Sequence, residues 1–320
     1  MADIISEQDA SSVAFVGAGY MAREHIQAFR DISGAELSGI FSRTISRAEN
    51  LAKEFGIKTV CGNLDELYEK TQANLVVIAV PELSVRPVSE VCFAYPWTCL
   101  IEKPAGYDVA DAEAIAGSAK STGCRAFVAL NRRHYSSTQT VLQDLATNTG
   151  LRLIHVQDQE DMIAALNAGQ PKLVVDNWMY ANSIHVADYL KIFGRGEIIS
   201  VEPSIRWNPD EPQFVLAKVA FSSGDVGIYE AVWNSPGPWA VSVTTQEIRW
   251  ELRPLEQAAF QPYGSRKLEP VAVHERDVKF KPGLRTQAEE AIKAARGQSH
   301  KLPSLDDALA SMKLVQIIYA

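Results

Sequence analysis

The chain has 320 residues, of which 47% are hydrophobic and 22% charged, the balance of an ordinary soluble globular protein. That length exceeds what one hydrophobic core usually supports, so two domains are expected. The net charge of −8 argues against a nucleic-acid or anionic-membrane partner, because such partners favour a basic face.

The sequence has no pattern typical of export, membrane insertion or metal binding. Its best membrane candidate, Leu75 to Val80, is only one strand long. Residues 1–11 contain acids and no base, unlike a secretory or transit signal. The four cysteines have neither CxxC spacing nor nearby paired histidines, so no metal site is expected. These features predict a cytoplasmic protein with free thiols.

Strands and helices alternate through the first 130 residues, after a polar lead-in at residues 1–11. Continuous apolar strands that alternate with helices indicate a parallel sheet covered on both faces, so we predict a doubly wound α/β domain over residues 1–130. The predicted strands are residues 13–16, 35–41, 59–61, 75–80, 97–101 and 126–130. The predicted helices are residues 20–29, 45–55 (closed by Gly56), 63–70, 83–94 and 108 to about 123.

Longer strands follow one another after residue 130. Several alternate apolar and polar residues, which suits a sheet with one covered face and predicts a second domain over residues 131–320. Its strands are predicted at residues 151–159, 198–206, 214–222, 225–234, 241–245 and 247–252. Helices are predicted at residues 138–146, about 182–193 and 304–320; Ser304 and Asp307 cap the last, which could pack back on the first domain.

Gly17-x-Gly19-x-x-Ala22 lies between the first predicted strand and the first predicted helix. That context is the one the dinucleotide-binding fingerprint requires. The first glycine permits a tight turn, the second lets the backbone approach a pyrophosphate, and Ala22 allows close packing of helix on strand. The pattern predicts a Rossmann domain that binds a dinucleotide. A glycine-rich turn of an α/β protein that binds another ligand is the alternative.

The end of the second strand favours NADP over NAD. An acid there would bind the ribose 2′-hydroxyl, whereas an arginine accommodates a 2′-phosphate. The chain has Ser42, Arg43 and Arg47 at this point and no acid. The alternative is that both guanidinium groups are solvated charges at the start of a helix.

Lys103 is the predicted acid/base, since it follows the fifth strand in Glu102-Lys103-Pro104. In open α/β sheets, ligands bind at the carboxyl ends of the strands. A lysine ammonium can bond a substrate oxygen and, with a pKa lowered by burial, exchange a proton with it. Pro104 keeps Lys103 out of the helical conformation and so aims its side chain. A solvated turn residue is the alternative.

The glycine fingerprint, Val80-Pro81 after an apolar strand and Glu102-Lys103-Pro104 together resemble the Gfo/Idh/MocA family, which includes glucose–fructose oxidoreductases and inositol dehydrogenases. The likeness extends over nearly the whole chain, through Asn131-Arg132-Arg133 to residues 303–309. It implies an α+β second domain with a large open, mostly antiparallel sheet that covers the nicotinamide and often mediates oligomer contacts. It also implies that Lys103 is the acid/base and that its bond to Pro104 is often cis.

The resemblance extends to a helix motif, Asp-x-x-x-His, in the second domain. His185 matches the histidine, which we expect to relay a proton or bind substrate. The aspartate position is filled by Ala181, with Asn182 as the nearest polar residue, and Asp188 lies one turn further on. A purely structural histidine is the alternative. Lys103 is therefore expected to act with less help than in relatives that have the aspartate.

The predicted function is NAD(P)-dependent hydride transfer between nicotinamide and a hydroxyl or keto carbon of a sugar, sugar derivative or sugar nucleotide. The alternative is a non-catalytic regulatory protein that binds dinucleotide and sugar on the same fold. We expect a homodimer or homotetramer. The predicted cofactor contacts are Gly17, Gly19, Tyr20, Met21, Ser42, Arg43, Arg47, Val80, Pro81, Glu82, Glu102 and Lys103. The predicted substrate contacts are Lys103, Asn131, Arg132, Arg133, Lys172, Trp178, Asn182 and His185.

Overall fold

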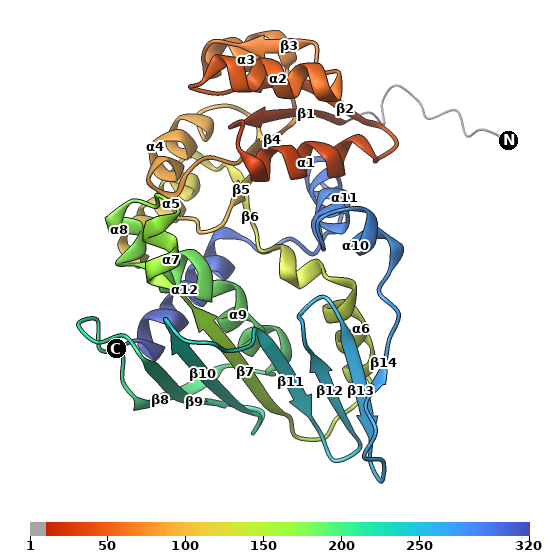
Figure 1. The fold of residues 1–320 in the computed structure, drawn as a ribbon. Coiled ribbons are helices and arrows are strands. Elements are labelled where there is room, and N and C mark those ends of the chain that lie inside the picture. The colour runs from red at the N-terminus through yellow and green to blue at the C-terminus, as the bar shows by residue number, and fades with distance from the viewer. Residues whose placement is uncertain (1–10) are drawn as a thin grey trace, which may run out of the picture. The chain divides into compact units, whose positions relative to one another are not determined.

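The computed structural model describes residues 11–320, which form two compact units (Figure 1). The first unit contains residues 11–106, 110–131 and 279–309. The second contains residues 107–109, 132–278 and 310–320. The predicted polar lead-in falls almost entirely outside the described residues, and Ser11 already belongs to the first strand.

A six-stranded parallel sheet forms the centre of the first unit and confirms the predicted doubly wound fold. Its strand order is β3-β2-β1-β4-β5-β6, so the order reverses between β1 and β4. Ligands of such sheets bind at the carboxyl ends of the strands near this reversal. The strands are β1 (Ser11–Val16), β2 (Ala35–Phe41), β3 (Thr59–Cys61), β4 (Leu75–Ile78), β5 (Thr98–Glu102) and β6 (Arg125–Ala129).

Helices cover the strands of this sheet because each presents an apolar stripe at helical spacing. On α1, for example, Ala22, Ile26 and Phe29 are buried in one cluster with Phe15 of β1. Gly56 ends α2 in the left-handed conformation, as predicted. The helices are α1 (Tyr20–Arg30), α2 (Ile45–Phe55), α3 (Leu64–Thr71), α4 (Glu82–Cys92) and α5 (Val109–Thr122).

One further helix of the first unit comes from near the end of the chain and was not predicted. This helix, α11 (Leu284–Ala295), buries Leu284, Ala288 and Ala291 in the same cluster as Phe29. The chain then pairs with β6, where the Val128 N–H donates to the Pro303 carbonyl at 3.0 Å. Residues 279–309 therefore complete the core of the Rossmann unit.

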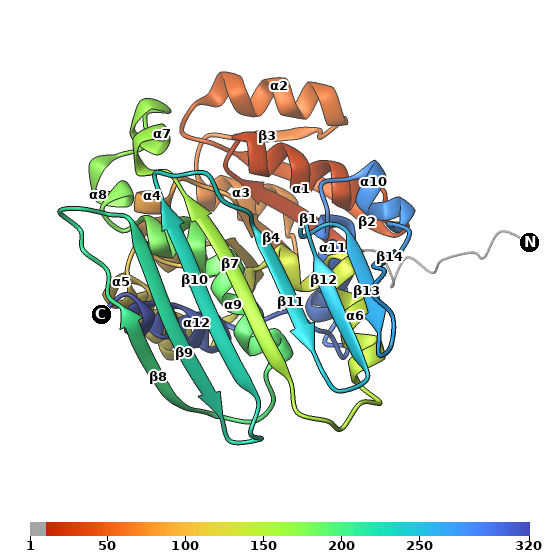
Figure 2. The same cartoon turned by 60° about the horizontal axis from the view of Figure 1, so that its bottom comes forward.

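The second unit has one eight-stranded sheet, and its mostly antiparallel pairing confirms the predicted class (Figure 2). Among the described residues, only the pairing of β7 with β10 in this sheet is parallel. The strand order is β14-β13-β12-β11-β7-β10-β9-β8. The strands are β7 (Leu153–Glu160), β8 (Ile198–Ile205), β9 (Phe214–Phe221), β10 (Val226–Trp233), β11 (Ala240–Thr244), β12 (Ile248–Leu252), β13 (Ala258–Pro262) and β14 (Glu269–Pro270).

Burial alternates along β7, β9 and β10, so one face of this sheet is covered, as the sequence pattern predicted. The buried helix α9 lies against β7. A π-helical turn, η3, precedes α9, and the predicted capping box between Ser304 and Asp307 begins α12. The remaining helices are η2 (Asn131–His134), α6 (Ser136–Leu145), α7 (Met162–Asn167), α8 (Lys172–Val175), η3 (Met179–Ser183), α9 (Ile184–Phe193), α10 (Glu275–Lys279) and α12 (Leu305–Ile318).

Candidate functional site

The glycine turn after β1 has the geometry that a bound pyrophosphate requires. Gly17 has φ +111°, and a Cβ there would overlap the carbonyl oxygen of Ala79 at the end of β4. A Cβ at Gly19 would meet no atom within 4 Å, so this side of the turn is open. Gly19 caps α1 without a side-chain hydrogen bond, and no acid lies in the first turn. The N–H groups of α1 therefore suit an anionic ligand.

The end of β2 lies beside this turn and presents positive charge. Gly17 N–H donates to the Phe41 carbonyl at 2.8 Å, which fixes the glycine turn against β2. Arg43 and Arg47 follow at the start of α2 and are exposed, and the first turn of that helix contains no acid. Ser42 is half-buried between them and the strand. The end of β2 therefore presents two exposed guanidinium groups and no acid in the first turn of α2.

The other predicted cofactor contacts in the first turns of α1 and α4 differ in exposure. Tyr20 is 66% exposed, and the Lys281 ammonium lies 5.4 Å from its ring centroid. Met21 is half-buried and packs against the core. After β4, Val80 is half-buried, Pro81 is exposed and caps α4, and Glu82 begins that helix. Tyr20 and the Val80–Glu82 segment are therefore accessible to a ligand, whereas Met21 serves mainly in packing.

Lys103 lies directly after β5, at the same sheet edge as the glycine turn, because all strands of this sheet are parallel. Glu102 before it is 6% exposed, and its Oε1 lies 2.6 Å from His25 Nε2 on α1. Its Oε2 accepts the Lys103 backbone N–H at 3.2 Å. The Lys103–Pro104 bond is cis, in agreement with the family resemblance. A buried hydrogen-bond partner from α1 thus holds Glu102, whose carboxylate in turn bonds the backbone from which Lys103 extends.

His25 was not selected as a candidate residue from the sequence. His25 is 1% exposed, and its imidazole makes the contact that ties α1 to the end of β5. The available signal was a polar side chain within the buried face of α1, since buried polar groups need a partner.

In the second unit, Asp188 pairs with Arg133 in a buried, bidentate ion pair. Both distances are 2.7 Å, and Ser311 Oγ donates to the same carboxylate at 2.6 Å. Burial alone would raise the pKa of Asp188, but the Arg133 charge and these hydrogen bonds outweigh it and lower the pKa. The pair makes Arg133 and Asp188 part of the structural core of this unit.

A cavity of about 520 Å³ brings two predicted substrate contacts together with residues that sequence reasoning missed. Trp178 Nε1 and Asn182 Nδ2 both donate to Glu160 Oε2, at 2.8 and 2.9 Å. The other side of the cavity includes the indole of Trp239, in the segment before β11. The lining residues are Gln159, Glu160, Asp161, Ala164, Ala165, Ala168, Gln170, Trp178, Asn182 and Trp239.

Trp239 also connects this cavity to two more predicted residues. The Arg132 guanidinium lies over its ring, 4.7 Å from the centroid, and the ring of His185 lies 6.4 Å away. His185 is 6% exposed and begins α9. Within residues 11–320, no carboxylate pairs with Arg132. Aromatic rings, a cation, an amide and a carboxyl group therefore converge here, as in sites that bind polar ligands.

Two predicted substrate contacts lie elsewhere in their units. Asn131 is 5% exposed in the first unit, where its Nδ2 donates to the Pro282 carbonyl at 3.0 Å. Lys172 is exposed and pairs with Asp176 one helical turn away at 2.6 Å, and it does not line the cavity. Asn131 thus bonds the backbone of the first unit, Lys172 faces solvent, and their predicted substrate contacts stay predictions.

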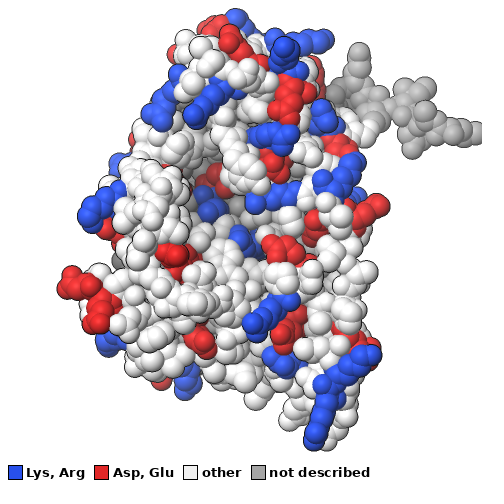
Figure 3. Space-filling view, in the orientation of Figure 1, with Lys and Arg blue, Asp and Glu red and all other residues white. Residues whose placement is uncertain are grey.

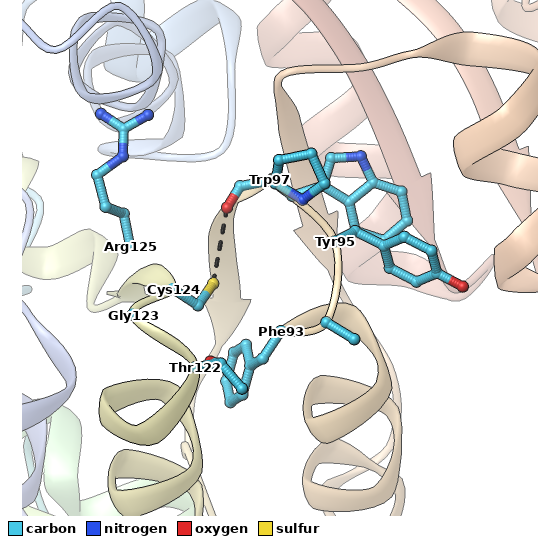
Figure 4. A pocket seen from close by; sticks show the side chains of 9 residues that line it. Phe93, Tyr95, Trp97, Thr122, Gly123, Cys124 and Arg125 are labelled. Carbon is cyan, nitrogen blue, oxygen red and sulfur yellow. Dashed lines mark hydrogen bonds between the residues drawn. The ribbon is translucent and has the colours of Figure 1, made fainter.

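A second cavity, of about 340 Å³, lies at the opposite edge of the Rossmann sheet from Lys103 (Figure 4). It adjoins the amino ends of β5 and β6, and its lining includes Tyr95, Trp97 and Cys124. Cys124 Sγ lies 3.6 Å from the Trp97 carbonyl and 3.7 Å from Cys99 Sγ. Because ligands of such sheets bind at the carboxyl edge, this cavity is a weaker candidate.

The described residues show neither a metal cluster nor a membrane span. In residues 11–320, no three or more His, Cys, Asp or Glu side chains are arranged to hold a metal ion. No helix in this range combines the length and apolar character that a bilayer crossing needs. On the face in Figure 3, positive and negative side chains are interspersed.

A parallel Rossmann sheet with a glycine fingerprint and a lysine at its carboxyl edge defines a dinucleotide-dependent enzyme. Residues 11–130 match the model of the Gfo/Idh/MocA family, described as "Oxidoreductase family, NAD-binding Rossmann fold". The chain is 24% identical to 4-carboxy-2-hydroxymuconate-6-semialdehyde dehydrogenase of Sphingobium over 293 residues, 89% of this chain and 90% of the relative. It is also 32% identical to UDP-N-acetylglucosamine 3-dehydrogenase of Acidithiobacillus ferrooxidans over 105 residues, about a third of each chain.

Solved structures share the fold of both units. The structure of UDP-N-acetylglucosamine 3-dehydrogenase from Acidithiobacillus ferrooxidans has a TM-score of 0.77 and 19% identity, and covers 96% of each chain. Levoglucosan dehydrogenase, in complex with NADH and levoglucosan, also has a TM-score of 0.77, with 15% identity over 97% of this chain and 96% of the neighbour. The likeness therefore extends beyond the Rossmann unit to the eight-stranded sheet.

Proposed function

We propose that this chain is an NAD(P)-dependent dehydrogenase or reductase of a sugar, sugar derivative or sugar nucleotide. The observation that carries the proposal is the position of the glycine turn and Lys103 at the carboxyl edge of one parallel sheet. Relatives named D-apiose dehydrogenase, glucose-6-phosphate 3-dehydrogenase and UDP-N-acetylglucosamine 3-dehydrogenase support the substrate class.

The first unit holds the cofactor and supplies the acid/base in this proposal. The α1 N-terminus and the Gly17–Gly19 turn bind the pyrophosphate. When bound, the nicotinamide accepts or donates the hydride. Lys103 Nζ takes the proton from the substrate hydroxyl during oxidation and returns it to the alkoxide during reduction. Glu102, held by His25, fixes the backbone of Lys103 so that Nζ has a defined reach.

The second unit binds the substrate in this proposal. Trp178 and Trp239 offer aromatic surfaces for the apolar faces of a ring, and Asn182 offers an amide. Arg132 suits a carboxylate or phosphate on the substrate, because guanidinium binds such anions with two parallel hydrogen bonds. His185 is the proposed second proton site. Since Ala181 replaces the aspartate of the family motif, Lys103 bears the larger part of the acid–base chemistry.

NADP is the proposed cofactor, with NAD as the alternative. Arg43 and Arg47 are exposed at the end of β2, where no acid would repel a 2′-phosphate. Titration of the protein with both cofactors, followed by fluorescence, tests this choice. Tighter binding of NADP is expected, and tighter binding of NAD would contradict it.

The test of the enzymatic proposal is the Lys103→Met variant. We first screen the wild-type protein with both cofactors against sugars, phosphorylated sugars, carboxylated sugars and sugar nucleotides, following absorbance of the reduced nicotinamide. Lys103→Met is then expected to lower kcat about a hundredfold or more while changing cofactor affinity less than about threefold. The matched control is Lys172→Met, an exposed lysine that lies outside the cavity. Full activity of Lys103→Met would refute the assignment.

Ala181 favours a second candidate function, a regulatory protein that binds dinucleotide and sugar without turnover. The missing motif carboxylate is the specific observation behind it. Cofactor binding with no absorbance change across the whole panel would select this function. Thermal stabilisation by a sugar in the presence of cofactor would then identify the ligand, because a ligand that binds only the folded state raises its stability.

A homodimer or homotetramer is the proposed assembly. Leu153 and Phe214, on β7 and β9 of the large sheet, are 45% and 50% exposed. A large sheet commonly dimerises through its exposed face when that face is apolar. Light scattering coupled to size-exclusion chromatography measures the mass in solution, and a monomer at all concentrations would contradict this proposal.

A further inference from the structure

Two carboxyl groups at the end of β7 are buried where an apolar residue is expected. The inward positions of this strand are Ile154, Val156, Asp158 and Glu160, and the two acids are only 2% and 1% exposed. Acids are almost never fully buried unless they are paired or hydrogen-bonded. Neither acid forms an ion pair with a lysine or arginine within residues 11–320. Their burial therefore needs another explanation.

Within residues 11–320, the hydrogen bonds to these two carboxyl groups reach only one oxygen of each. Asp158 Oδ2 accepts from Tyr229 OH at 2.5 Å, and that hydroxyl lies 2.9 Å from Tyr319 OH. Glu160 Oε2 accepts from Trp178 and Asn182. Asp158 Oδ1 and Glu160 Oε1 are buried with no donor among the described residues. Asp158 and Glu160 lie two residues apart on the same side of β7, and each carboxyl group acts on the pKa of the other.

We propose that Asp158 and Glu160 share one proton between these two oxygens, and that the resulting pair positions Trp178 and Asn182 at the cavity. One proton satisfies both oxygens, whereas two ionised carboxylates would repel each other with no donor between them. Burial raises the pKa of both groups, and the neighbouring Asp158 charge raises that of Glu160 further. The pair therefore titrates as one unit.

The pair acts on the substrate through the residues that it holds. Because Asn182 Nδ2 donates to Glu160, its Oδ1 is left to accept a hydrogen bond from a substrate hydroxyl. Trp178 is held by its Nε1, so the cavity receives the apolar face of its ring. Both residues flank Ala181, the motif position without its aspartate. The segment that contains Trp178, Ala181 and Asn182 is thus hydrogen-bonded to the Glu160 carboxyl group of β7. This part of the inference rests on the proposed function.

Infrared spectroscopy of the full-length protein tests the shared proton without any substrate. At about pH 7 the wild type is expected to show the carbonyl band of a buried, protonated carboxyl group. Asp158→Asn and Glu160→Gln should each remove it, since the amide N–H₂ can donate to the remaining carboxylate. The matched control is Glu230→Gln on the adjacent β10, a partly exposed acid next to His155. Absence of the band in wild type, or its persistence in both variants, would overturn the proposal.

The pH dependence of unfolding provides a second readout. A carboxyl group with a raised pKa in the folded state stabilises the protein fully below its unfolded pKa, and this is lost as pH rises through the folded pKa. Wild-type stability should therefore fall relative to Glu160→Gln as the pH rises from the ordinary carboxyl pKa through the raised pKa of the pair. The groups that face the pair are Tyr229, Tyr319, Ser183, Trp178, Asn182 and Trp239. Parallel pH curves for the two proteins would contradict a shared proton.

Kinetics test the positioning role once a substrate is known. Glu160→Gln keeps an acceptor for Trp178 and Asn182, so its KM should stay within about threefold of wild type. Glu160→Ala loses that acceptor and should raise KM about tenfold or more, with a smaller change in kcat. Equal KM values for both variants would refute positioning. If no substrate is turned over, the proposed function fails, and the infrared and unfolding results still decide the shared proton.

Discussion

The glycine turn of the first unit and the cavity of the second are built in opposite ways. The turn depends on Gly17 and Gly19, two residues apart, and on backbone groups at the carboxyl edge of the sheet. The cavity needs side chains from β7, η3 and the segment before β11, which are up to eighty residues apart in the sequence. A backbone site can therefore be recognised from a short motif, whereas a side-chain site of this kind requires the fold.

Substitution of Gly17 should have the largest effect and tests the backbone site. Gly17→Ala combines a positive φ with overlap at the Ala79 carbonyl, so we expect a loss of about 3 kcal/mol in unfolding free energy. Urea denaturation measures this loss in unfolding free energy. The matched control is Gly19→Ala, where φ is −92° and a Cβ meets no atom. Gly19→Ala should keep the stability and weaken cofactor binding. Equal stability losses for the two variants would contradict this account of the turn.

Loss of the Arg133–Asp188 pair tests whether the second unit depends on long-range side-chain contacts. Asp188→Asn leaves a largely buried guanidinium without its charge partner, so a loss of about 2 kcal/mol is expected. The wild type should lose stability as pH falls through the lowered pKa of Asp188, and the variant should not show this part of the loss.

The exposed pair Lys172–Asp176 provides the control for this experiment, because Asp176→Asn removes an acid from a solvated helix surface. Its effect should stay within about 0.5 kcal/mol. The unfolding free energy of both variants is measured by urea denaturation at about pH 7. Comparable losses for Asp188→Asn and Asp176→Asn would show that burial of the Arg133–Asp188 pair adds nothing to stability.

Arg132 provides a second comparison, because its guanidinium has no acidic partner within residues 11–320, whereas that of its neighbour Arg133 pairs with Asp188. Arg132→Met should raise KM about thirtyfold for substrates with a carboxylate or phosphate, since a charge-assisted contact is lost. A neutral sugar turned over by the same protein should be affected less than about threefold. Steady-state kinetics on a charged and a neutral substrate measure the difference, and equal effects would place Arg132 outside anion recognition.

The smallest predicted effect concerns Arg43 and Arg47 beside the backbone site. The double variant Arg43→Ala/Arg47→Ala should weaken NADP binding about tenfold and leave NAD binding nearly unchanged. Fluorescence titration with each cofactor measures both affinities. If both cofactors lose affinity equally, the arginines contact a group that NAD and NADP share.

Sequence patterns predicted the first six strands and the main helices between them because these elements form from local apolar runs and glycine signals. The class of the second sheet was also predicted, from alternating strands and from the family resemblance. The helix α11 was not predicted, since its partners lie more than two hundred residues earlier in the chain. The local sequence of a helix does not show that it packs against a core formed by a much earlier part of the chain.

The candidate site was also predicted only in part. Trp178 and Asn182 were selected and do line one cavity, but their anchor, Glu160, was not selected. Its signal was the position of two acids on the inward side of an alternating strand, which becomes visible only when the phase of β7 is known. His25 was missed for a related reason, because its partner Glu102 is 77 residues away in the chain.

The return of α11 to the Rossmann unit bears on how the protein is made. During synthesis, the first 130 residues leave the ribosome long before Leu284, Ala288 and Ala291, which fill part of the core around Phe29. Until then, the apolar surface that α11 covers remains open to water or to a chaperone. Premature termination anywhere before residue 284 should therefore yield a chain prone to aggregation rather than an independent nucleotide-binding domain.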